Sequence, residues 1–182
     1  KSDITDPKHP LTKIENGSLE YDIDRFAYEK EATLKDVHFA LKKGQTLGIV
    51  GQTGSGKTSL LKLLLRKYDV NQGTIKLNGH DIRQYRLADL RSLIGYVPQD
   101  QVLFAMSILD NIRFGDPNLT FTAVEGATKL SQVYDDIVAM PQGFDTIIGE
   151  KGVSLSGGQK QRIAMSRAMI LNPDILILDD SL

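Results

Sequence analysis

The sequence predicts an α/β fold, and three observations lead to this class. Several segments of alternating or continuous apolar residues have the length of strands. A leucine-rich stretch directly after a glycine-rich loop is typical of a packed helix. From about residue 102 to residue 170 the pattern is mainly helical. A chain of 182 residues suits one domain, or one domain with an inserted lobe.

The strands are expected mainly in the first part of the chain. Residues 1–17 are polar and include an Asn16–Gly17 turn, which is typical of a linker or tail. Alternation then predicts a strand over 19–28 and a second one around 37–41. A turn follows, and it leads into a short apolar strand over 46–50.

A helix is predicted over residues 58–67, where "TSLLKLLLRK" holds five leucines in ten residues and should pack on a sheet. Residues 74–77 alternate and end at Asn78–Gly79, a pair typical of hairpin turns. A short helix is expected over 87–93. Further on, the continuous apolar run over 175–178 fits a central parallel strand that is buried on both faces.

Composition argues against several classes of function. The net charge is −1 and no long basic run is present, so nothing supports nucleic-acid binding. Without cysteine there is no disulfide and no thiolate metal site. No apolar run reaches the roughly 20 residues of a membrane span. The chain begins with Lys1, shows no signal peptide and ends directly after an apolar strand, so we expect a piece of a longer protein.

The stretch "GQTGSGKT" fits the phosphate-binding pattern G-x-x-x-x-G-K-[ST] between a strand and a helix. Glycines let backbone N–H groups wrap a phosphate, and the helix N-terminus adds its dipole. Lys57 can reach the outer phosphates, and the Thr58 hydroxyl can ligate Mg²⁺. A glycine-rich turn with a chance lysine is the alternative. The candidate nucleotide-binding residues here are Gly51, Gln52, Thr53, Gly54, Ser55, Gly56, Lys57, Thr58 and Ser59.

Two further motifs follow. "ILILDD" places Asp179 at the end of an apolar strand, where a carboxylate helps to hold Mg²⁺ in enzymes with such a loop. A solvated acid at a strand end is the alternative. "LSGGQ" opens a helix. At the start of that helix, the hydroxyl of Ser156 and the N–H groups of Gly157 and Gly158 can form a second anion-binding site. Because one nucleotide hardly needs two such sites, we expect this one to receive the γ-phosphate bound by another subunit.

On these motifs the chain resembles the nucleotide-binding domain of ATP-binding cassette (ABC) transporters, and the exporter branch in particular, from about residue 19 to residue 182. "GQTGSGKT" is Walker A, "VPQD" with Gln99 the Q-loop, "LSGGQ" the signature and "ILILDD" Walker B. The resemblance implies a P-loop NTPase core with an N-terminal antiparallel β subdomain, together spanning 18–100. It further implies an inserted α-helical subdomain over 101–170, and a C-terminally truncated end over 171–182.

The resemblance also implies roles for single residues. Tyr28 would stack on the adenine of ATP, although a half-buried strand tyrosine is the alternative. Thr58, Gln99 and Asp179 would organise Mg²⁺. The residues that would act on the nucleotide held by a partner cassette are Ser156, Gly157, Gly158 and Gln159.

The implied partners are a second nucleotide-binding domain, packed head to tail, and transmembrane domains. The coupling helices of the latter would lie near Gln99 and near Glu150 in "TIIGEKG", which an ordinary polar loop could also explain. The chain would then work at the cytoplasmic face of the membrane. An importer subunit, a soluble cassette protein acting on DNA or ribosomes, and a non-hydrolytic dimerisation module are alternatives.

Asp180 departs from the family pattern, which has a catalytic glutamate there. The shorter side chain should withdraw the carboxylate by roughly 1–1.5 Å, enough to cost about 100-fold in rate. Such a residue beside an intact signature resembles the degenerate half of a heterodimeric exporter. The alternative is a working homodimer in which the exchange of glutamate for aspartate is tolerated. The catalytic candidates are Asp180 and Gln99. The D-loop and the switch histidine are expected after Leu182, so this piece alone should be a weak ATPase.

Overall fold

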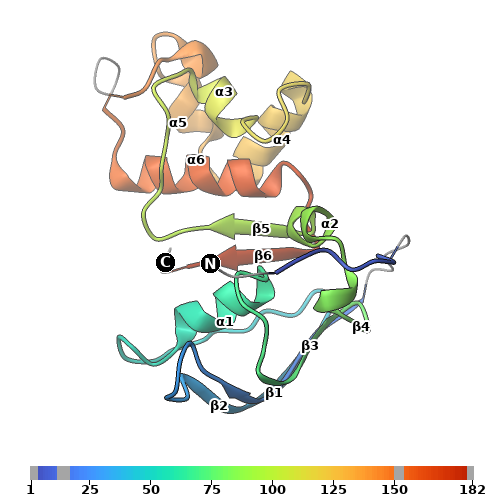
Figure 1. Ribbon diagram of the computed structural model, residues 1–182. Coiled ribbons are helices and arrows are strands. Elements are labelled where there is room, and N and C mark those ends of the chain that lie inside the picture. The colour runs from blue at the N-terminus through green and yellow to red at the C-terminus, as the bar shows by residue number, and fades with distance from the viewer. Residues whose placement is uncertain (1–3, 12–16, 150–153, 180–182) are drawn as a thin grey trace. The chain divides into compact units, whose positions relative to one another are not determined.

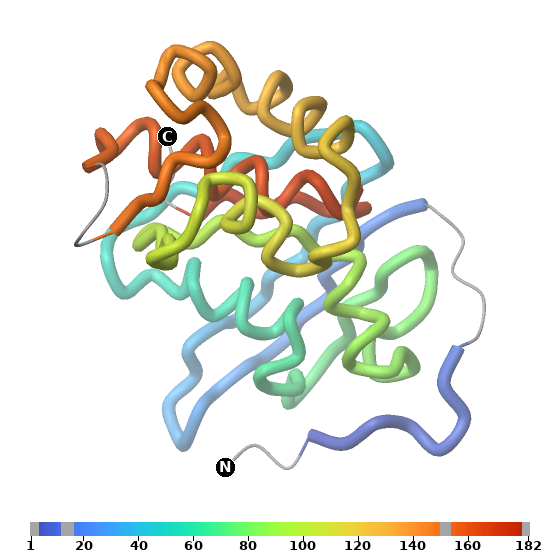
Figure 2. The backbone as a smooth tube through the Cα atoms, turned by 90° about the horizontal axis from the view of Figure 1, so that it is seen from above, coloured from blue at the N-terminus to red at the C-terminus, as the bar shows by residue number. Residues whose placement is uncertain are grey.

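The computed structural model describes residues 4–11, 17–149 and 154–179. The chain forms two compact units that divide in the sequence between Arg91 and Ser92. Figure 1 labels the elements of both units, and Figure 2 follows the same backbone from above.

The first unit contains a four-stranded antiparallel sheet in the order β2–β1–β3–β4 (Figure 1). The predicted alternation is confirmed, because Tyr21 and Ile23 are buried and Tyr21 pairs with Phe39 on one side and Ile75 on the other. The strands are β1 (Ser18–Phe26), β2 (Leu34–Lys42), β3 (Gln72–Leu77) and β4 (His80–Asp81).

Helix α1 (Lys57–Leu64) packs on this sheet, as its leucine content predicts. Leu60, Leu63 and Leu64 are buried. The Tyr21 hydroxyl donates a hydrogen bond to the Leu60 carbonyl at 3.0 Å, and burial raises the pKa of that hydroxyl above its usual range. Sheet and helix are therefore joined at the turn of α1 that follows the glycine loop.

The predicted hairpin turn and short helix are also present. Asn78 and Gly79 have φ of 54° and 78°, the left-handed values of a tight hairpin turn between β3 and β4. A 3₁₀-helix, η1 (Ile82–Gln84), follows, and then α2 (Leu87–Ser92).

The prediction of a strand over residues 46–50 is wrong. These residues have no regular secondary structure, and Val50 is 94% exposed. An apolar run has the propensity for a strand, but a strand also needs a neighbour to satisfy its N–H and C=O groups. In the described ranges no strand pairs with residues 46–50.

The second unit joins a parallel two-stranded sheet to a group of helices. β5 (Ile94–Val97) and β6 (Ile175–Leu178) pair with Ile94 opposite Ile175 and Val97 opposite Leu178. The mainly helical character of residues 102–170 is confirmed. The helices are α3 (Ile108–Ile112), α4 (Phe121–Leu130), α5 (Tyr134–Val138), η2 (Gly143–Asp145) and α6 (Gly157–Met169).

The core of the second unit lies among these helices. Its centre is α6, which contacts both α3 and α4 and buries Ile163 completely. Leu155, just before α6, belongs to the same core, so the signature begins on a buried anchor. The other core residues are Ile108, Ile112, Val124, Val133, Ile137, Phe144 and Ile148.

The prediction that β6 is buried on both faces is wrong, because Leu176 is 39% exposed whereas Ile177 is 9% exposed. Within the described residues β6 pairs with β5 alone, so it lies at the edge of its sheet. Nowhere in the described ranges is there a helix with the length and apolar character needed to cross a bilayer.

Candidate functional site

Gly56 lets the glycine loop turn directly into helix α1. It is the N-cap of that helix and has φ of 94°, a conformation that side chains other than glycine rarely adopt. A Cβ at Gly56 would also lie 2.6 Å from Cδ2 of Leu34. Conformation and space therefore both require glycine here.

Free backbone donors gather where α1 begins. The N–H groups of Gly54, Gly56, Lys57 and Thr58 donate to no acceptor in the described part of the chain. These donors, together with the positive end of the helix dipole, make an anion site. The residues around them are accessible, since Thr58 is exposed and Lys57 is half-buried.

The Lys57 ammonium group folds back over its own loop. Its Nζ donates to the carbonyl oxygens of Gly51 at 2.6 Å and Gln52 at 3.0 Å. Ser55 closes the loop, since its N–H donates to the Gln52 carbonyl at 3.1 Å. An ammonium group has three donors, so Lys57 can still serve an anion at the loop.

Tyr28 lies beside this loop in the same unit. Its hydroxyl donates to Oγ of Ser59, which is buried in α1, at 3.0 Å, and the residue is 41% exposed. Its ring meets Phe26 edge-on at 4.9 Å and Tyr68 edge-on at 4.8 Å. Tyr28 is thus a partly open aromatic ring joined to α1, while Phe26, which is 2% exposed, belongs to the core.

Sequence reasoning missed two neighbours of that ring, Tyr68 and Lys62. The Lys62 Nζ lies 5.7 Å from the ring centroid of Tyr28, within the range of a cation–π interaction. Lys62 stands five residues after Lys57 on α1, and a lysine at that spacing carries no motif. Only the contact with Tyr28 identifies it.

In the second unit, Asp179 and Gln99 come directly after neighbouring parallel strands. Asp179 follows β6, and its N–H donates to the Val97 carbonyl of β5 at 3.0 Å. Gln99 lies two residues beyond β5 and is exposed. Because the carboxyl ends of parallel strands share one edge, both residues lie at the same edge of this sheet.

Tyr96 on β5 is a third member of this edge that sequence reasoning missed. Its hydroxyl donates to Oδ2 of Asp179 at 2.9 Å. Burial, then the hydrogen bond to the Asp179 carboxylate and the charge of that carboxylate, raise the pKa of Tyr96 to about 12. The signal available in the sequence was the alternation of side chains along each strand. With Tyr96 opposite Ile177, this alternation places Tyr96 and Asp179 on the same face of the sheet.

The chemistry of this edge fits a hard cation. In the ranges that the structure describes, no three His, Asp or Glu side chains gather as a ready metal centre. Mg²⁺ does not need such a cluster, because it is often held by one or two carboxylates together with waters and substrate phosphates. A single oriented carboxylate such as Asp179 suits that mode of binding.

The signature forms the start of α6. Ser156 is the N-cap, with its Oγ accepting from the Gln159 N–H at 3.2 Å, while Oε1 of Gln159 accepts from the Ser156 N–H at 3.0 Å. This capping box satisfies two donors and leaves those of Gly157 and Gly158 without an acceptor in the described residues. Both glycines are exposed, so a second anion site faces solvent.

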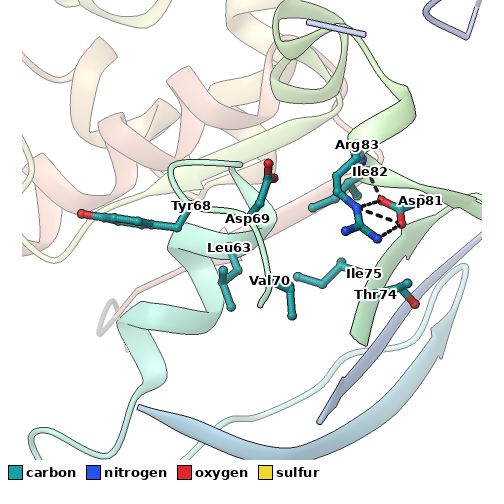
Figure 3. Close-up of a pocket in the computed structure, with 9 residues that line it drawn as sticks. All are labelled: Leu63, Tyr68, Asp69, Val70, Thr74, Ile75, Asp81, Ile82 and Arg83. Atoms are coloured by element: carbon teal, nitrogen blue, oxygen red, sulfur yellow. Dashed lines mark hydrogen bonds and ion pairs between the residues drawn. The ribbon is translucent and has the colours of Figure 1, made fainter. Parts of the chain in front are cut away.

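A pocket in the first unit includes Tyr68, the neighbour of the Tyr28 ring, and Figure 3 shows its lining. Its cavity of about 10 Å³ has room for about one water molecule, so it is too small for a nucleotide. None of the predicted site residues lines it. The lining residues are Leu63, Tyr68, Asp69, Val70, Thr74, Ile75, Asp81, Ile82 and Arg83.

The structure brings the Walker A residues and Tyr28 together in the first unit. In the second unit it places Gln99 and Asp179 at one strand edge and gathers the signature residues at the start of α6. Asp180 and Glu150 lie outside the described residues.

Comparison with known proteins identifies relatives along almost the whole chain. Residues 34–182 match the profile of a family described as "ABC transporter". The chain is 46% identical to the probable multidrug resistance ABC transporter ATP-binding/permease protein YheI of Bacillus subtilis, over 100% of this chain and 32% of that protein. It is 44% identical to the multidrug resistance-like ATP-binding protein MdlA of Escherichia coli, over 98% of this chain and 30% of that protein.

A human protein and a solved structure also match this chain. ATP-binding cassette sub-family B member 6 of Homo sapiens is 44% identical over 93% of this chain, which covers 20% of the human protein. The solved structure of a bacterial Atm1-family ABC exporter with ATP bound superposes with a TM-score of 0.88 and 37% identity, over 98% of this chain and 32% of that one. The chain thus spans about a third or less of the length of these relatives.

The fold, the glycine loop at the start of α1 and the signature at the start of α6 agree with these matches. The chain belongs to the ABC transporter family.

Proposed function

We propose that this chain is the ATP-binding motor domain of an exporter-type ABC transporter. The observation that carries the proposal is the N-terminus of α1. Backbone N–H groups without an acceptor gather there, next to the glycine loop and to Lys57. The relatives agree in type, since two of them are named for multidrug resistance and a solved neighbour is an exporter with ATP bound.

In this proposal the loop holds the phosphates of ATP and Tyr28 stacks on the adenine. The backbone of Gly51, Gln52, Thr53, Gly54, Ser55 and Gly56, with Lys57, Thr58 and Ser59, surrounds the phosphates. The partly exposed ring of Tyr28 supports the stacking role, because it presents aromatic surface while its hydroxyl is tied to α1 through Ser59. The same hydrogen bond links the base-binding residue to the phosphate-binding helix.

Mg²⁺ would be held by Thr58, Gln99 and Asp179. When bound, the cation would neutralise charge on the phosphates of the nucleotide. The hydrogen bond from Tyr96 to Asp179 supports this role, because it keeps the carboxylate oriented.

The signature would act on the nucleotide of a second cassette. Ser156, Gly157, Gly158 and Gln159 lie at an anion site that is separate in sequence from the loop of the first unit. Two such sites suit two chains that pack head to tail, each loop facing the other chain's signature. Closure of this dimer on ATP would drive the transmembrane domains from the cytoplasmic face of the membrane.

An aromatic surface in the second unit supports contact with transmembrane domains near Gln99. The rings of Phe104 and Phe114 stack at 4.4 Å and are 36% and 51% exposed, and Val102 is 60% exposed. Arg167 donates to the Val102 carbonyl at 2.8 Å and so holds this segment in place. Coupling helices would contact this surface and Glu150.

Asp180 makes this half of the transporter a poor hydrolytic site in the proposal. The reach of its carboxylate is shorter than that of the usual glutamate, while the signature is intact. A heterodimer with one active partner site explains that combination. A competent homodimer, or an importer subunit, is the alternative.

Lys57→Ala tests the proposal in the complete protein. A fluorescent ATP analogue should bind saturably and be displaced by ATP, and the substitution should weaken this binding at least 10-fold because a phosphate contact is lost. Lys67→Ala is the matched control, since Lys67 is an exposed lysine just after α1. Lys62 is unsuitable because it lies over the Tyr28 ring. Equal losses for Lys57→Ala and Lys67→Ala would contradict the role of Lys57.

A further inference from the structure

Tyr96 and Asp179 share one face of the sheet in the second unit. Tyr96 of β5 stands opposite Ile177 of β6, and Asp179 follows Ile177 by two residues. Side chains alternate between the faces of a sheet with a period of two, so all three lie on the same face. An aromatic side chain is long enough to reach a diagonal neighbour, which is how the Tyr96 hydroxyl reaches Oδ2 of Asp179 at 2.9 Å.

Helix α6 lies on the opposite face. A Cβ at Gly95 would lie 2.8 Å from the carbonyl oxygen of Ala168 in α6, so the Gly95 face is the one that this helix covers. Tyr96 points the other way by alternation. Its hydroxyl is therefore not part of the packing between β5 and α6.

Asp179 is tied to β5 at two points. Its N–H donates to the Val97 carbonyl at 3.0 Å, which continues the ladder past the end of β6. Its carboxylate accepts from Tyr96, and a hydrogen bond to a charged acceptor is among the stronger ones in proteins. Together the two bonds set the position of the backbone and the direction of the carboxylate.

We propose that Tyr96 is a positioning residue that orients Asp179 for Mg²⁺. The inference rests on the proposed function, in which Asp179 is a ligand of that cation. Groups that hydrogen-bond to a metal-binding carboxylate tune metal affinity without touching the metal. Tyr96 belongs to none of the motifs, and its hydroxyl is directed at the Asp179 carboxylate rather than into the packing of β5 against α6.

Tyr96→Phe removes one oxygen atom and keeps the ring. In the purified, complete protein, we would titrate Mg²⁺ against the binding of a fluorescent, non-hydrolysable ATP analogue and repeat the measurement in EDTA. We expect the Mg²⁺ concentration for half-maximal enhancement of binding to rise about 10-fold, and the affinity in EDTA to stay unchanged. Tyr134→Phe removes the same atom from α5 in the same unit and should change neither value.

Each outcome decides the question. An unchanged Mg²⁺ dependence would overturn the role of Tyr96. An equal loss with and without Mg²⁺ would overturn it too, because that result marks a purely structural contribution. If the unsubstituted protein did not bind the analogue at all, the proposed function would fail and this inference with it. Binding by the unsubstituted protein with an unchanged Mg²⁺ dependence in Tyr96→Phe would overturn the inference alone.

Discussion

Tyr28 and Phe26 are two residues apart on the chain, yet their environments differ. Phe26 ends β1 inside the core, whereas Tyr28 lies beyond the strand with a partly open ring and a hydroxyl bonded to Ser59. Both side chains are aromatic, and the family resemblance assigned the stacking role to Tyr28. The different burial of the two rings supports that choice. It also suits a binding role for the partly exposed Tyr28 and a stabilising role for the buried Phe26.

Tyr28→Ala should weaken ATP binding about 10- to 100-fold, because stacking on an aromatic ring contributes about 1–3 kcal/mol. It should cost less stability than the change at Phe26, because the Tyr28 ring is partly exposed and the Phe26 ring is buried. Phe26→Ala should instead lower the free energy of unfolding by about 3–5 kcal/mol. Nucleotide titration and urea denaturation of the two variants would measure both effects, and the reverse pattern would assign the stack to Phe26.

At the scale of elements, each of the two proposed anion sites is the start of a helix, but the two starts are built differently. Helix α1 begins on Gly56, which has no side chain to cap it, so its first N–H groups stay free. Helix α6 begins on a capping box, so Ser156 and Gln159 use their side chains locally while the glycines between them keep free N–H groups.

Gly56→Ala should destabilise the start of α1 more than Gly54→Ala does. Both glycines have positive φ, which costs roughly 1–2 kcal/mol for an alanine. At Gly54 nothing lies within 4 Å of an added Cβ, whereas at Gly56 Cδ2 of Leu34 lies 2.6 Å away. Urea denaturation should therefore show an additional loss of roughly 1–3 kcal/mol for Gly56→Ala. Equal losses would show that Leu34 moves away at little cost.

Ser156→Ala should act across the proposed dimer. In the complete transporter it should lower hydrolysis at the partner's nucleotide, while the affinity of this chain's own loop for ATP stays nearly constant. The loss of the cap should also cost about 1 kcal/mol of stability, so unfolding is measured in parallel. Loss of ATP affinity in this chain would make Ser156 a ligand of its own nucleotide and would contradict the head-to-tail arrangement.

At the scale of the whole molecule, the proposed function makes Asp180 the residue that would decide whether the transporter has one active site or two. Asp179 before it is held by the hydrogen bond from its N–H to the Val97 carbonyl of β5. In the proposal, the reach of the next carboxylate would therefore depend on side-chain length. An aspartate would keep negative charge near Mg²⁺ but place the attacking water poorly. ATP would then stay bound at this chain while the partner's site turns over.

Asp180→Asn should leave most of the ATPase activity of the complete transporter, whereas removal of the partner's glutamate should abolish most of it. The physical reason is that a poorly placed carboxylate contributes little to the rate of hydrolysis, so its removal should lower that rate only slightly. Nucleotide trapping should find unhydrolysed ATP at this chain's loop. If Asp180→Asn alone stopped turnover, or if the protein were an active homodimer, Asp180 would be the catalytic base and the asymmetric model would fail.

The sequence by itself determined the features that depend on neighbouring residues. The strands of the first unit follow from alternation, the hairpin from Asn78–Gly79, and the helix after the loop from its leucines. The positions of the glycine loop, the signature and Asp179 were also readable, because each is a short motif beside a recognisable strand or helix. These features need only local conformational preferences and periodicity.

Only the tertiary structure decided the features that depend on partners far away in the chain. Residues 46–50 have the composition of a strand but form none, and Leu176 is apolar but exposed, because pairing and covering come from other segments. The hydrogen bonds from Tyr28 to Ser59 and from Tyr96 to Asp179 span 31 and 83 residues. Such contacts depend on strand register and on the packing of helices against sheets, which local preferences do not specify.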